Sequence, residues 1–86
     1  MVKPTITGVF PNPFYDYFTL QFETPTEDNN IILQDALGKI VFEKNIKTHS
    51  GENSAIIQIG EDLPQGMYFV FVKSSNGSKA VHKIIH

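Results

Sequence analysis

The sequence predicts an all-β protein, a seven-stranded antiparallel immunoglobulin-like β-sandwich. Apolar and polar residues alternate with a period of two along most of the chain, as on strands with one buried and one wet face. Clusters of Pro, Gly, Asn and Asp separate these short runs at regular spacing, which is typical of the turns in a sandwich. No segment has a helical pattern.

The strands follow from these two signals, in chain order. The predicted strands are 6–10, 17–23, 31–34, 40–46, 55–59, 67–73 and 79–85. The strand at 67–73 is apolar on both faces, as expected of a central strand. In the strand at 40–46 the phase stays open, because Ile40, Phe42 and Ile46 point one way and Val41 the other.

Turn residues connect the strands. The stretch 24–30 predicts a loop, with Asp28-Asn29-Asn30 as a turn cluster. Ser50-Gly51 marks a turn in the polar stretch 47–53, and Asn76-Gly77 is a strong hairpin signal. The alternation then predicts a core of Phe18, Leu20, Phe22, Leu33, Ile57, Tyr68, Val70 and Val72.

Composition and net charge exclude several classes of function. The 86 residues form one domain, 1–86, with a net charge of −2. This net charge provides no basic surface of the kind that binds nucleic acid. No apolar stretch reaches the ~18 residues of a membrane helix. All basic residues are Lys, and the absence of Cys excludes thiol catalysis and cysteine-based zinc sites.

The residues predict no enzyme, no metal and no cofactor. His82 and His86 share a strand face, but a metal site needs three or four convergent ligands and nothing points to the rest; we expect both to be solvated. Ser, His and Asp residues are present, yet the chain has no nucleophile elbow and no room for an enclosed pocket.

Three motifs join a rigid turn to an apolar strand. They are Phe10-Pro11-Asn12-Pro13-Phe14, Leu33-Gln34-Asp35-Ala36-Leu37-Gly38-Lys39 and Leu63-Pro64-Gln65-Gly66-Met67-Tyr68-Phe69-Val70. The prolines fix φ near ~ −65°. We expect Gly38 and Gly66 to take positive φ, which glycine adopts without steric penalty.

In this order the motifs resemble the C-terminal sorting domain of the type IX secretion system (type A, Por secretion system), over about residues 8–86. Each motif alone is a weak signal of this family, but the three motifs in this order and at this spacing form a strong one. The positions that carry the family motif or are candidates for recognition are Pro11, Asn12, Pro13, Asp16, Asp35, Gly38, Pro64, Gly66, Tyr68, Phe71 and Lys83.

The resemblance implies a function without chemistry of its own. Such domains direct cargo through the outer-membrane translocon, and a cysteine-protease sortase usually removes them and attaches the cargo to the cell surface. The resemblance therefore implies a periplasmic stage, a final location at the cell surface or outside the cell, and an upstream cargo domain in a longer secreted chain.

Two questions stay open at the level of sequence. The rival function is a cell-surface adhesive or carbohydrate-binding sandwich, in which Tyr15 and Tyr17 could stack on sugars. The aromatic set Phe14, Tyr15, Tyr17, Phe69 and Phe71 is expected mainly to pack, with Phe71 the best candidate for an outward patch. Lys83 is either an edge-strand gatekeeper or part of the recognised terminal segment.

Overall fold

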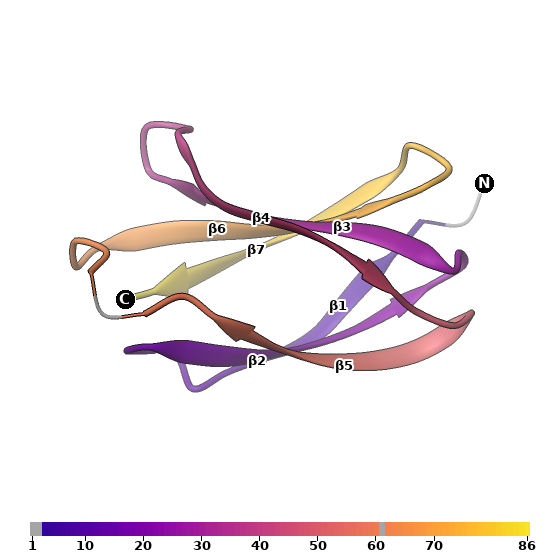
Figure 1. The fold of residues 1–86 in the computed structure, drawn as a ribbon, viewed down its shortest axis with the longest axis horizontal. Coiled ribbons are helices and arrows are strands. Elements are labelled where there is room, and N and C mark those ends of the chain that lie inside the picture. The colour runs from indigo at the N-terminus through magenta and orange to yellow at the C-terminus, as the bar shows by residue number, and fades with distance from the viewer. Residues whose placement is uncertain (1–2, 61) are drawn as a thin grey trace.

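The computed structural model describes residues 3–60 and 62–86, and these form two antiparallel sheets packed face to face (Figure 1). The strands are β1 (Thr5–Phe10), β2 (Tyr17–Thr24), β3 (Asp28–Asp35), β4 (Ile40–Lys47), β5 (Gly51–Gln58), β6 (Met67–Ser74) and β7 (Lys79–Ile85). One sheet has the order β1-β2-β5 and the other β4-β3-β6-β7. The predicted seven-stranded sandwich is confirmed. Within the described residues, no helix is long and apolar enough to cross a bilayer.

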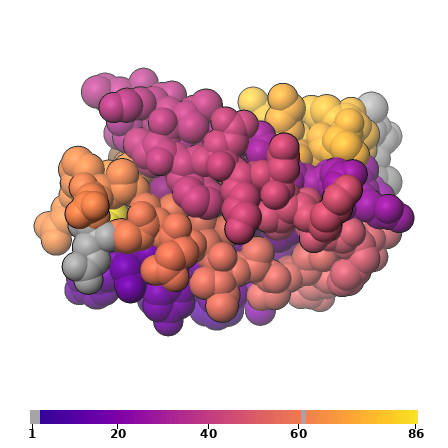
Figure 2. Space-filling view, viewed as in Figure 1, coloured from indigo at the N-terminus to yellow at the C-terminus, as the bar shows by residue number. Residues whose placement is uncertain are grey.

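The sandwich is elongated, 35 × 22 × 17 Å, so its two ends are distinct surfaces. The chain enters at one end and its C-terminus lies at the other (Figure 1). In the space-filling view, the turns at 35–40 and 62–67 crowd together at the C-terminal end, and the β6–β7 hairpin lies at the opposite end (Figure 2).

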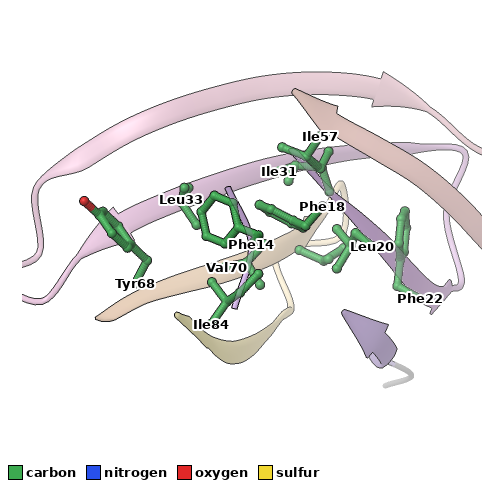
Figure 3. Packing of buried hydrophobic residues seen from close by; sticks show 11 residues of the cluster. Phe14, Phe18, Leu20, Phe22, Ile31, Leu33, Ile57, Tyr68, Val70 and Ile84 are labelled. Carbon is green, nitrogen blue, oxygen red and sulfur yellow. The ribbon is translucent and has the colours of Figure 1, made fainter. Parts of the chain in front are cut away.

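The core lies between the sheets and contains all eight predicted residues (Figure 3). It also contains Phe14, Ile31 and Ile84, none of which is exposed. Phe14 lies outside any strand, and its ring packs edge-on against Phe18 at 5.1 Å between centroids. Packing was therefore the correct expectation for Phe14, whereas Tyr15 and Tyr17 are 71% and 42% exposed.

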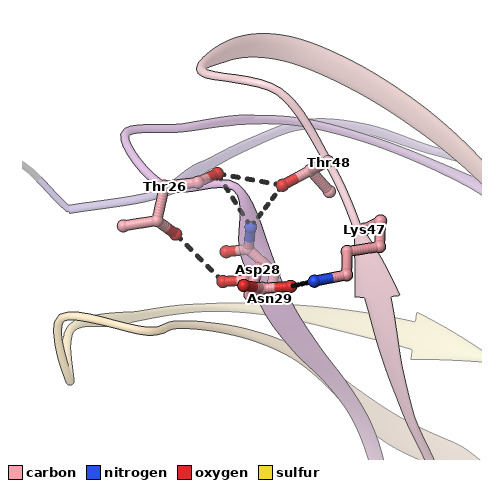
Figure 4. A network of polar contacts seen from close by, with 5 residues as sticks. All are labelled: Thr26, Asp28, Asn29, Lys47 and Thr48. Atoms are coloured by element: carbon pink, nitrogen blue, oxygen red, sulfur yellow. Dashed lines mark hydrogen bonds and ion pairs between the residues drawn. The ribbon is translucent and has the colours of Figure 1, made fainter.

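The predicted loop over 24–30 was wrong at both ends, because β2 includes Thr24 and β3 begins at Asp28. Asn29, expected in a turn cluster, is buried. Its side chain accepts a hydrogen bond from Thr24 Oγ1 at 2.9 Å. It also donates to Thr48 Oγ1 at 2.8 Å (Figure 4). A polar residue is tolerated in the interior once its hydrogen bonds are satisfied, so polarity alone was a misleading sign of a loop.

A β-bulge resolves the phase of β4. Leu33 pairs with Phe42 but the next residue, Gln34, pairs with Ile40, so Val41 is left over. This extra residue lets Val41 and Phe42 both pack against the core, whereas Ile40 is 49% exposed.

The fifth strand is earlier than predicted, Gly51–Gln58 instead of 55–59. Ile59 lies beyond it and donates its N–H to the carbonyl of Asp16 at 2.8 Å. The predicted turn at Ser50-Gly51 survives only in part, because β5 begins at Gly51, whose φ is 110°.

Candidate functional site

The three sequence motifs meet at one end of the sandwich, which we call the motif end (Figures 1 and 2). It consists of the β1–β2 corner (residues 10–16), the β3–β4 turn (35–39), the segment 63–68 and the C-terminal residues 84–86. The motifs are distant in sequence and adjacent in space because every strand pair is antiparallel, so alternate turns fall at the same end.

The Pro-Asn-Pro corner is tied to the last strand. Asn12 Oδ1 accepts a hydrogen bond from the N–H of Ile85 at 3.0 Å, and Phe14 N–H donates to the carbonyl of Ile85 at 2.8 Å. Both X–Pro peptide bonds, before Pro11 and before Pro13, are cis. Asn12 thus provides a hydrogen-bond acceptor for a backbone N–H of the edge strand β7 that has no partner within the sheet.

Asp16 acts in this corner through its backbone. Its carbonyl accepts hydrogen bonds from the N–H groups of Ile59 and Gly60, at 2.8 and 2.9 Å. It therefore joins the corner to the segment that leaves β5.

The late motif closes the same end from the other sheet. Gly66 and His86 exchange backbone hydrogen bonds, with His86 N–H to Gly66 O at 2.9 Å and Gly66 N–H to His86 O at 3.3 Å. The φ of Gly66 is 150°, so the expected positive φ is confirmed.

Tyr68 fixes the turn that precedes it. Its side chain is buried, and its hydroxyl points out of the core (Figure 3) and donates to the carbonyl of Pro64. This is the arrangement of a tyrosine corner, in which a strand tyrosine bonds backbone a few residues upstream. Burial, and secondly the Asp35 carboxylate, raise the pKa of Tyr68 above its ordinary value.

The β3–β4 turn is held by Asp35. Its Oδ1 accepts from the N–H groups of Leu37 and Lys39, each at 2.9 Å, and Gly38 has a φ of 88°, as expected. This turn projects Leu37 into solvent, where it is 95% exposed. Between this turn and the segment 63–68 lies an open hollow of about 340 Å³, lined in part by Val41, Leu63 and Met67.

Phe71 and Lys83 are the predicted site residues that lie away from the motif end. Both are on the outer face of the four-stranded sheet, where Phe71 is paired with Val81 and Lys83 with Phe69. Phe71 is partly exposed and Lys83 is exposed, on the edge strand β7. Val70 and Val72 are buried on the opposite face, so the predicted outward direction of Phe71 is confirmed.

The histidines differ from one another. His82 is exposed as expected, and its Nδ1 lies 2.7 Å from the carbonyl of Lys83. The expectation that His86 is solvated was wrong, because its ring lies 4.7 Å from that of Phe14 and 6.2 Å from that of Tyr68. Among the described residues, no group of three or more His, Cys, Asp and Glu could hold a metal ion.

Sequence reasoning missed Leu37 and His86. A leucine between Asp35 and Gly38 is placed by the turn at its tip, so its exposure could have been foreseen from turn chemistry. Nothing in the sequence signals His86, because its position depends on the corner and the late motif meeting at the C-terminus.

Comparison with known proteins gives the family. A family model described as the secretion system C-terminal sorting domain matches residues 8–86. No curated protein matches the chain. No solved structure matches it. The matched region contains all three motifs and every strand except the start of β1. The chain belongs to the C-terminal sorting domains of the type IX secretion system, non-catalytic tags that interact with this machinery and mark proteins for export across the outer membrane to the cell surface or the extracellular space.

Proposed function

We propose that residues 1–86 act as a single folded address for an upstream cargo domain. The cargo reaches the periplasm, the outer-membrane translocon takes it up through this domain, and a cysteine-protease sortase then removes the domain and attaches the cargo to the cell surface. Membership of the sorting-domain family supports this sequence of steps. A stable scaffold with exposed recognition elements and no enclosed pocket is suited to an address.

The motif end is the surface that the translocon reads in this proposal. The observation that carries it is the convergence of the three motifs on one end, around exposed Leu37. Single exposed leucines are common on protein surfaces. Leu37 differs because a turn closed by Asp35 holds it beside an apolar hollow, so the partner meets a fixed shape.

The motif residues divide into two roles under this proposal. Most of them shape the end without being read themselves, by bending the backbone or by capping it. This group comprises Pro11, Asn12, Pro13, Asp16, Asp35, Gly38, Pro64, Gly66 and Tyr68. Leu37 and Tyr15 are presented to the partner, since both side chains are largely exposed.

The test is export of a reporter. The chain is fused behind a periplasm-directed reporter in a bacterium that has the type IX system, and surface or medium release is measured. We expect release that is lost in a strain without the translocon. Retention of the wild-type fusion in the periplasm of the system-bearing strain would overturn the proposal.

A matched pair of variants tests the motif end. Leu37→Ser should leave the fold intact and lower export severely. Ile56→Ser is the control, because Ile56 is also an exposed aliphatic residue, 69% exposed, and its strand β5 belongs to the other sheet. Surface changes of this kind usually move stability by less than ~0.5 kcal/mol, so loss of folding does not explain the result. Equal export of the two variants would reject Leu37 as a recognised residue.

One observation favours the rival function, carbohydrate binding. Tyr15 and Tyr17 are close in sequence and both exposed, as a sugar-stacking pair would be. A domain that binds glycans through them loses that binding on Tyr15→Ala and Tyr17→Ala, whereas a sorting domain without this activity shows no glycan binding to lose.

A further inference from the structure

The outer face of the four-stranded sheet has an apolar strip. Phe71 lies between Ile32 on β3 and Val81 on β7, and Phe69 lies between Gln34 and Lys83. Val81 is 55% exposed, and Ile32, Phe69 and Phe71 are partly exposed. The strip therefore remains in contact with water along the middle of the sheet.

Lysines border this strip on one side. Lys73 on β6 lies directly opposite Lys79 on β7, and Lys83 follows on the same face of β7. We call this surface the lysine-bordered face: Ile32, Phe69, Phe71 and Val81 with Lys73, Lys79 and Lys83. Like charges directly opposite one another destabilise a sheet, so folding does not account for the Lys73–Lys79 pair. The chain as a whole carries a net charge of −2, so this basic border runs against its overall charge.

Ion pairing does not account for the lysines either. Within residues 3–60 and 62–86, the ion pair found joins Lys47 to Asp28, at 2.8 Å. Lys79 instead places its Nζ over the ring of Phe71, 5.6 Å from the centroid. This contact keeps an ammonium group at the apolar strip, where an incoming carboxylate would meet it.

The hollow in this face and the acidic residue Glu43 on its β4 side favour a protein partner over a lipid surface. Ile32, Gln34, Phe71, Lys73 and Lys79 line a hollow of about 360 Å³, large enough for a side chain. On the β4 side, Glu43 lies opposite Ile32 and accepts a hydrogen bond from Asn30 Nδ2 at 2.6 Å. A uniformly anionic membrane would be repelled by Glu43, whereas a protein can match a basic and an acidic border at once.

We propose that the lysine-bordered face is a second docking surface, which binds an acidic surface with an exposed apolar side chain on the type IX translocon. The inference rests on the proposed function and adds a contact separate from the motif end. The apolar side chain of the partner enters the hollow beside Phe71, and its carboxylates pair with Lys73, Lys79 and Lys83. Lys83, on this reading, is a recognised residue as well as an edge-strand charge.

The experiment measures binding of the domain to purified, immobilised type IX translocon at several salt concentrations. The double variant Lys73→Gln/Lys79→Gln is compared with Lys3→Gln/Lys44→Gln, which removes the same charge from exposed lysines elsewhere. We expect the first to bind about tenfold more weakly, mainly through slower association, and with a weaker dependence on salt. The control should bind like the wild type.

Two further variants and a folding measurement complete the test. Lys83→Ala and Phe71→Thr should each weaken binding. The denaturation midpoint of Lys73→Gln/Lys79→Gln should stay close to the wild-type value, because relief of the like-charge pair offsets loss of the contact between Lys79 and the Phe71 ring. A lower midpoint together with weaker binding would attribute the effect to folding and overturn the inference.

The remaining outcomes separate this inference from the proposed function. Wild-type binding with unaffected Lys73→Gln/Lys79→Gln and Phe71→Thr variants overturns the second docking surface alone. Wild-type binding to phosphatidylglycerol vesicles that depends on the same lysines, with translocon binding unaffected, also overturns it in favour of a lipid surface. Absence of any wild-type binding to the translocon overturns both.

Discussion

The two ends of the sandwich are closed by different means. At the motif end, backbone groups of the corner, the late motif and the C-terminus bond to one another. At the opposite end, which we call the polar end, side chains form the network instead. It consists of Thr24, Thr26, Asn29, Thr48 and Ser74.

This difference explains why the side-chain network of the polar end has no sequence signature, whereas the turns at both ends have one. A turn that needs a fixed φ accepts few residue types, so Pro and Gly positions are recognisable in the sequence. A side-chain network only needs matched donors and acceptors, which many combinations of Thr, Ser and Asn supply. The motif end therefore suits a surface that a secretion machinery must find on many different cargo proteins.

The largest effect expected at the motif end comes from Phe14→Ala. Phe14 is fully buried and attaches the corner to the core through Phe18 and His86, so its loss leaves a cavity and frees the corner. We expect the free energy of unfolding to fall by about 3–5 kcal/mol in urea denaturation. Tyr15→Ala, at an exposed neighbour, is the control and should change it by less than ~0.5 kcal/mol. Similar effects for the two would show that the corner does not depend on the core.

The polar end has its own test in Asn29→Leu, which keeps the volume and removes the hydrogen bonds. The hydroxyls of Thr24 and Thr48 lose their bonds to Asn29. The Thr48 hydroxyl still donates to the carbonyl of Thr26 at 2.9 Å, so the buried Thr24 hydroxyl is the main group that loses its partner. We expect a loss of about 1–3 kcal/mol. Asn45→Leu, on the exposed side of β4, should be nearly neutral. A neutral Asn29→Leu would mean that the polar end tolerates an apolar closure and that its network is dispensable.

The two ends also mark how far the sequence predicts this structure. Sequence patterns located all seven strands and eight core residues, although β3 and β5 begin earlier than predicted, and turn chemistry anticipated positive φ at Gly38 and Gly66. The polar end was misread because burial of Asn29 depends on Thr24 in β2 and Thr48 just after β4. Likewise, the packing of Phe14 on His86 requires the β1–β2 corner to meet the C-terminus. Both features depend on tertiary contacts that local patterns do not encode.

Backbone strain at the motif end gives the next largest effect. Val at Gly38 or Gly66 must adopt a φ of 88° or 150°, which side chains rarely take, although no atom lies within 4 Å of the added Cβ. We expect each variant to lose about 1–3 kcal/mol of unfolding free energy from strain alone. Gln65→Val, exposed beside Gly66, should be nearly neutral. If the Gly66 and Gly38 variants denature at the wild-type midpoint, these turns adapt and do not enforce the shape of the motif end.

The smallest expected effect is a pH dependence at the motif end. Burial, and then the charge of Asp35, raise the pKa of the Tyr68 phenol, so the folded state favours the neutral form. The stability that this contributes is fully present below the unfolded-chain pKa of about 10 and is lost as the pH rises through the higher folded-state pKa.

Tyr68→Phe tests this directly. At neutral pH the variant loses the hydrogen bond to the Pro64 carbonyl, about 0.5–1.5 kcal/mol. Its stability should then decline less than that of the wild type as the pH rises past 10, so the two curves converge. The pKa of Lys47 is raised as well, first by its hydrogen bond to Asp28. High salt weakens this exposed ion pair and so separates its part of the alkaline decline from that of Tyr68. Tyr15→Phe should follow the wild-type curve. Parallel curves for Tyr68→Phe and wild type across the alkaline range would show that Tyr68 ionises as easily in the folded chain as in the unfolded one.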